Sequence, residues 1–122
     1  MPVACAKKTH REIAYKEITC SALRNRLKVS KPTVRVRAND HIQFSSRLPV
    51  TVTFEEASPF DDEILEFSIA PEDTIDKVVK SCVERLHAEA HGHGHAKCTF
   101  KYSVTAEGFR ILDPQIIVDC EG

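Results

Sequence analysis

The feature that most constrains this chain is a period of two in its apolar residues from Leu27 onward. Leu27 and Val29 alternate with charged or polar residues, and after an interruption at Pro32 the alternation resumes with Val34 and Val36. Alternate side chains of a β-strand face opposite sides of a sheet, so this period predicts strands with one buried face. Because proline cannot donate to a sheet ladder, Pro32 predicts either one bent edge strand or two short strands.

Further short segments of strand composition follow, and turn residues such as Asn39-Asp40 and Asp113-Pro114 separate them. The expected strands cover roughly residues 41–44, 50–54, 64–69, 99–105 and 116–118. Short strands with turns at this spacing are typical of a sandwich or a barrel. The sequence therefore predicts a mainly β domain.

One segment, from Glu72 to Ala90, has a different period. Its apolar residues fall at i, i+3, i+4, i+7 and i+11, which is the stripe of an amphipathic helix; they are Ile75, Val78, Val79, Cys82 and Leu86. Asp73 and Thr74 are residues that cap helix N-termini. We therefore expect a helical insertion around residues 72–90.

The N-terminal region predicts an arm outside the sandwich. Thr9 and Glu12 match a capping box, in which both side chains bond to backbone N–H groups at the start of a helix, and this indicates a short helix over roughly residues 10–23. The expected organisation is an arm over residues 1–24 and one sandwich domain over residues 25–122.

Length and composition set limits on the class of protein. The chain has 122 residues, of which 42% are hydrophobic, which suits one domain with a real core. It has no apolar run long enough to span a membrane, and its first residues lack the apolar core of a secretory signal. As written, the sequence predicts a cytoplasmic protein, or a periplasmic or secreted one if a signal has been removed. The odd count of five cysteines, without a CxxC pair, favours thiols.

Two stretches carry a resemblance to a known family. The sequence VRVRANDHIQFSSRLPVTVTF, taken together with the later CTFKYSVTAEGFRILDPQIIV, resembles the cupredoxin-like domains. The likeness covers roughly residues 27–120 and is a pattern of strands and turns. It implies a Greek-key β-sandwich, with the expected helix as an insertion between two strands.

The positions that hold copper in cupredoxins differ in this chain. By the resemblance, the first ligand histidine would fall on Val50 or its neighbour, the second on Ala106 and the ligand cysteine on Ser103, and the only methionine is Met1. A blue-copper centre needs a thiolate and two imidazoles held together. We therefore expect a cupredoxin-like domain without a blue-copper centre.

A second candidate for metal chemistry is the stretch HAEAHGHGHAKC. It contains four of the six histidines and one cysteine, namely His87, His91, His93, His95 and Cys98. If the helix continues to about Ala90, the first two histidines stand at i and i+4 on one face, where two imidazoles can chelate one ion. One interpretation is a site for nickel, zinc or copper used in storage, delivery or sensing. The other is a solvated, glycine-rich loop that must lose conformational entropy to bind.

Charge is distributed unevenly along the chain. Residues 1–47 carry 11 Lys/Arg and three Asp/Glu, and the remainder carries six and 15, although the net charge is −1. Five cations occupy alternate positions and would share an outer sheet face; they are Arg24, Arg26, Lys28, Arg35 and Arg37. Such a face suits an acidic protein partner or self-association, or it is a solvated edge that blocks strand pairing. The absence of interleaved aromatic residues disfavours nucleic acid.

No motif of a known catalytic class occurs in the sequence. The nucleophile-elbow, zinc-protease, P-loop and dinucleotide-binding patterns are all absent, and the chain has only four glycines. The acidic run at Asp61-Asp62-Glu63 lacks the ligand spacing of a calcium loop and is interpreted as solvated. The sequence therefore predicts a non-catalytic binding or accessory module, with a metal-handling protein as the alternative.

Overall fold

A computed structural model describes residues 12–80 and 95–121 of the chain. These residues form nine β-strands and no helix. The strands are β1 (Tyr15–Leu23), β2 (Arg26–Val29), β3 (Thr33–Arg37), β4 (His41–Ser46), β5 (Val50–Phe54), β6 (Glu66–Ile69), β7 (Thr74–Val78), β8 (His95–Thr105) and β9 (Gln115–Glu121). The prediction of a mainly β sandwich is confirmed.

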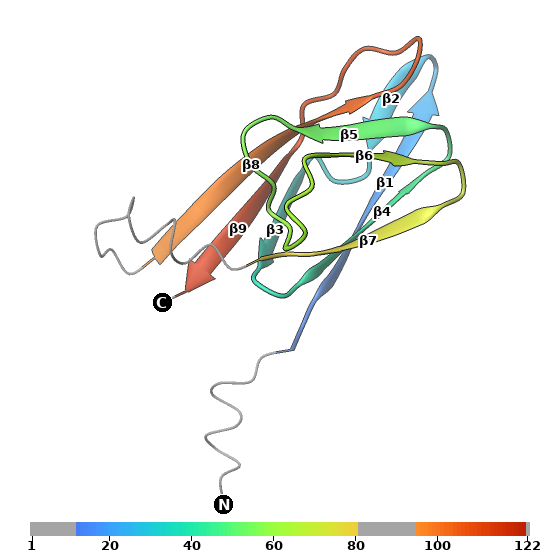
Figure 1. The fold of residues 1–122 in the computed structure, drawn as a ribbon. Coiled ribbons are helices and arrows are strands. Elements are labelled where there is room, and N and C mark those ends of the chain that lie inside the picture. Colours follow the sequence, from blue (N-terminus) through green and yellow to red (C-terminus); the bar gives the residue numbers. More distant parts are fainter. Residues whose placement is uncertain (1–11, 81–94, 122) are drawn as a thin grey trace, which may run out of the picture.

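The strands form two mixed sheets, shown in Figure 1. The first sheet has the order β2-β1-β4-β7, and the second has the order β3-β9-β8-β5-β6. One pair in each sheet is parallel, β1 with β4 and β3 with β9. The chain passes from one sheet to the other between β2 and β3, the place where Pro32 interrupts the alternation. Of the two alternatives for Pro32, the structure therefore has two short strands.

The core lies between the sheets and follows the alternation in the sequence. On β4, for example, Ile42 and Phe44 are fully buried. The Phe44 ring packs edge-on against Phe60, Phe67 and Tyr102, with centroids 6.0, 5.2 and 6.2 Å away. These contacts join strands of both sheets, because Phe44 belongs to the first sheet and Tyr102 to the second.

The helical insertion predicted around residues 72–90 is wrong over its described part. Residues 74–78 form β7, which pairs with β4 so that Ile75 lies opposite Phe44. Burial there has a period of two, since Lys77 and Val79 are buried and Asp76 is exposed. The run is rich in β-branched residues, and pairing with β4 satisfies its backbone, so the sheet determines its structure. Residues 81–90 of the expected helix lie outside the described residues.

The N-terminal arm predicted over residues 1–24 is also corrected. Residues 15–23 form β1, an inner strand of the first sheet, where Ile18 and Cys20 are fully buried. The apolar residues of this segment showed no clean period in the sequence, because β1 buries only its middle and exposes Tyr15 and Leu23. The described domain therefore includes β1. The capping box at residues 9–12 lies almost wholly outside the described residues.

Along its described length, the chain has no helix that is both long and apolar enough to cross a membrane.

Candidate functional site: a basic groove at one end of the sandwich

A tight turn between β1 and β2 presents one of the predicted binding residues, Arg24. The two turn residues, Arg24 and Asn25, both have positive φ, at 54° and 65°. Two such residues between paired strands form the turn that matches the twist of a hairpin. The turn projects Arg24 at the end of the sandwich, and it leaves the neighbouring Leu23 side chain 57% exposed.

The loop between β8 and β9 approaches this turn at the same end of the sandwich, at the top of Figure 1. Leu112 and Val104 exchange two backbone hydrogen bonds of 3.1 Å, which hold the C-terminal part of the loop to β8. Gly108 has a φ of 86°, a conformation that favours glycine. Between these points Ile111 projects outward and is 65% exposed.

The turn, β2 and this loop enclose a groove of about 1230 Å³, which we call the basic groove. Its lining extends from Leu23 to Lys28 on one side, and on the other it consists of Gly108 and the residues from Arg110 to Leu112. Four cations and no carboxylate line it; the cations are Arg24, Arg26, Lys28 and Arg110. Among the described residues, none of the four has an ion-pair partner. Glu107 and Asp113 flank the loop in sequence without lining the groove.

The five cations predicted to share one face lie on two different sheets, so that prediction is wrong. Arg26 and Lys28 lie on β2 of the first sheet, whereas Arg35 and Arg37 lie on β3 of the second. Arg35 is also partly neutralised, since its Nη1 atom lies 3.4 Å from Oδ1 of Asp119. The alternation continues across Pro32, but the change of sheet separates the cations into two groups.

Arg110 and Ile111 also line the groove, although neither was predicted from the sequence. They are more than 80 residues from the turn in the sequence, and no motif connects the two segments. The local signals, Gly108 and the Asp113-Pro114 pair, indicated only a loop. The folding of β8 and β9 places this loop beside β2.

The predicted metal ligands are only partly described. His87, His91 and His93 lie outside the described residues. His95 is the first residue of β8 and stands opposite Glu121 in the ladder, and Cys98 is buried in the core with 8% exposure. Among the side chains that the structure describes, no three from histidine, cysteine, aspartate or glutamate are close enough together to hold a metal ion.

The positions aligned with copper ligands carry other side chains. Val50 is 3% exposed, and together with Ala106 it lines a shallow pocket of about 670 Å³. Ser103 lies on β8 opposite Thr53. None of these three side chains is a ligand for copper.

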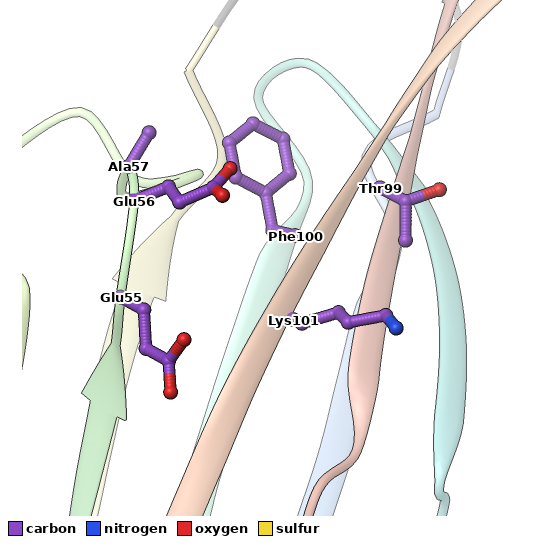
Figure 2. Close-up of a pocket in the computed structure, with 6 residues that line it drawn as sticks. All are labelled: Glu55, Glu56, Ala57, Thr99, Phe100 and Lys101. Atoms are coloured by element: carbon purple, nitrogen blue, oxygen red, sulfur yellow. The ribbon is translucent and has the colours of Figure 1, made fainter.

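A smaller pocket, of about 360 Å³, lies where β5 and β8 diverge (Figure 2). Glu55 and Glu56 line one side of this pocket, and Thr99 and Phe100 line the other. Figure 2 shows that Lys101 points away from both carboxylates, so no charge pair closes the pocket. The arrangement offers no nucleophile or ligand cluster.

The acidic run was predicted to be solvated, but two of its three members have specific partners. Asp62 Oδ2 lies 2.7 Å from Nζ of Lys77, and Glu63 Oε1 lies 2.9 Å from Nζ of Lys80. The side chain of Lys77 is only 8% exposed. Burial raises the pKa of Asp62, but the Lys77 hydrogen bond and charge and the N–H of Ile64 outweigh it, so this pKa lies below its ordinary value.

Comparison with known proteins identifies no family from the sequence. No family model matches the chain, and no curated protein matches it. Solved structures with a similar fold include an oxidised point mutant of amicyanin, at a TM-score of 0.49 and 14% identity, over 89% of this chain and 94% of that one. This likeness concerns the fold alone. The described part of the chain is a β-sandwich of two mixed sheets, as the strand pattern predicted.

Proposed function

We propose that this chain is a non-catalytic binding module that holds an acidic segment of a partner protein in the basic groove. The observation that carries the proposal is the convergence of four cations on a groove without a lining carboxylate. Cations that share a concave surface raise the local concentration of an oppositely charged ligand. An acidic segment is therefore the class of ligand that this groove favours.

Two exposed aliphatic side chains also line the groove. Leu23 and Ile111 line the groove and are 57% and 65% exposed, so each loses contact with water when a ligand covers it. Charge gives orientation and a fast association, whereas burial of apolar surface contributes affinity. The groove therefore suits a segment that carries both acidic and apolar residues.

The lining also bears on whether the ligand is a nucleic acid. Single-stranded nucleic acids bind to cationic grooves by stacking their bases on aromatic side chains. No aromatic side chain lines the basic groove, and the whole chain has a net charge of −1. These features favour a protein ligand over an oligonucleotide.

The test is fluorescence anisotropy with a labelled peptide of roughly twelve residues that contains glutamate and leucine in equal numbers. We expect the double variant Arg26→Glu, Lys28→Glu to weaken binding by about tenfold or more. The matched control is Arg35→Glu with Arg37→Glu, which makes the same charge change on the other sheet and should alter Kd by less than about twofold. Circular dichroism checks that each variant is folded.

Salt and competition complete the test. Raising the salt concentration from about 50 mM to about 300 mM should weaken the wild-type complex, because the cations are exposed to solvent. Equal weakening by the two double variants would refute the assignment of the groove. Equal competition by an oligonucleotide of the same charge would refute the preference for protein.

A further inference from the structure

The basic groove lies beside an open strand edge. β2 is the terminal strand of its sheet, paired with β1 on one side. Among the described residues, no strand pairs with the other side of β2. An open edge presents unpaired N–H and C=O groups, which can pair with another extended chain.

The register shows which backbone groups face this edge. The two-residue turn makes Leu23 and Arg26 a hydrogen-bonded pair, and in an antiparallel ladder such pairs alternate with pairs that are not bonded. The hydrogen bond of 2.9 Å from the Ser30 N–H to the Thr19 C=O agrees with this alternation, because Thr19 and Ser30 each lie an even number of residues from the Leu23–Arg26 pair. The N–H and C=O groups of Leu27 and Val29 therefore point away from β1, toward the open edge.

The side chains of β2 also alternate between the two faces of the sheet. Arg26 and Lys28 are exposed on the outer face, and between them Leu27 is buried with 5% exposure. A residue directly opposite another in a neighbouring strand has its Cβ about 4.5–5.5 Å away, so like charges repel and opposite charges attract. The edge of a second copy would bring cations against cations, whereas an acidic strand would bring carboxylates against them.

From this juxtaposition we infer that the partner segment adds to β2 as an extended strand, with acidic residues at alternate positions and an apolar residue between them. The acidic residues lie opposite Arg26 and Lys28, and the apolar residue between them faces the groove beside Leu27 and Ile111. This inference rests on the proposed function and specifies how the ligand is held. It also implies that binding depends on the order of the residues in the ligand and not only on their composition.

The first experiment compares two peptides of the same composition. One alternates glutamate and leucine, and the other has the same residues in two blocks. Only the alternating peptide places every carboxylate on one face when extended, so we expect its Kd to be lower by about tenfold or more. Charge reversal provides rescue: the variant Arg26→Glu, Lys28→Glu should prefer a peptide that alternates lysine with leucine.

The second experiment tests backbone pairing directly. In an added strand only alternate residues bond to β2, so N-methylation of one set, all the leucines or all the glutamates, should abolish binding, and methylation of the other set should be tolerated. Antiparallel addition predicts that the leucines are the sensitive set, because they are opposite Leu27 and Val29, and parallel addition predicts the glutamates.

The outcomes separate this inference from the proposed function. If both peptide orders bind equally and neither methylation matters, strand addition is overturned, although an acidic ligand in the groove is retained. If no acidic peptide binds, or if charge reversal on β2 has no effect, the proposed function fails as well. Order dependence together with sensitivity of a single methylated set supports the inference.

Discussion

The ion pair between Lys77 and Asp62 should make the stability of the fold depend more on the carboxylate than on the ammonium. The Lys77 ammonium lies 2.7 Å from the carboxylate and 4.6 Å from the centroid of the Phe67 ring. The Lys77 side chain is 8% exposed and the Asp62 side chain 35%. Removing the carboxylate leaves a buried ammonium without a counter-charge, whereas removing the ammonium leaves a carboxylate that water already reaches.

The magnitudes follow from this difference in exposure. Breaking a fully buried pair costs about 3–5 kcal/mol of unfolding free energy, and because Asp62 is partly exposed we expect about 2 kcal/mol for Asp62→Asn. The asparagine still accepts the hydrogen bond from the N–H of Ile64, so the change isolates the charge. Lys77→Met keeps an apolar stem over Phe67 and should cost less than about 1 kcal/mol.

Urea unfolding followed by circular dichroism measures each variant and the double variant. In the Lys77→Met background, Asp62→Asn should cost almost nothing, which leaves a coupling free energy of about 1–2 kcal/mol. Equal losses for the two single changes, or a larger loss for Lys77→Met, would refute the reasoning that the buried ammonium needs a counter-charge.

The same pair predicts a dependence on pH. The folded pKa of Asp62 lies below its unfolded value of about 3.9. The stabilisation is therefore complete above that unfolded value and is lost as the pH falls through the folded pKa. The Lys77→Met variant should not show this part of the loss of stability at low pH. Urea midpoints measured between about pH 6 and pH 3 test this expectation.

Three further predictions concern the core. The Tyr102 hydroxyl is buried without a hydrogen-bond partner among the described residues, so Tyr102→Phe should raise the unfolding free energy by up to about 1 kcal/mol in urea titrations, and a clear loss would reveal a partner. Burial raises the pKa of the Cys20 thiol to about 11, so iodoacetamide at pH 8 should label it only after unfolding, as peptide mass spectrometry would show; rapid native labelling would contradict its burial. Phe44→Ala should lower the unfolding free energy by about 3–5 kcal/mol, because Phe44, on the first sheet, packs against Phe60 and against two rings of the second sheet; a loss below about 1 kcal/mol would contradict this role.

The sequence by itself determined most of the strands and much of the core. The face to which a strand residue points depends on its own position in an alternation, and this is a local property. Val34, Val36, Ile42 and Phe44 are therefore buried as their alternation predicted. The missing copper ligands at Val50, Ser103 and Ala106 can likewise be read directly from the sequence.

Only the tertiary structure decided which strands share a sheet and which loops meet. The apolar residues from Ile75 to Val79 suit a helix as well as a strand, and pairing with β4 decided between them. The change of sheet between β2 and β3 separated two groups of cations that look continuous in sequence. The basic groove needs the β1–β2 turn beside Arg110 and Ile111, more than 80 residues away, and such contacts depend on the packing of the whole sandwich rather than on local sequence.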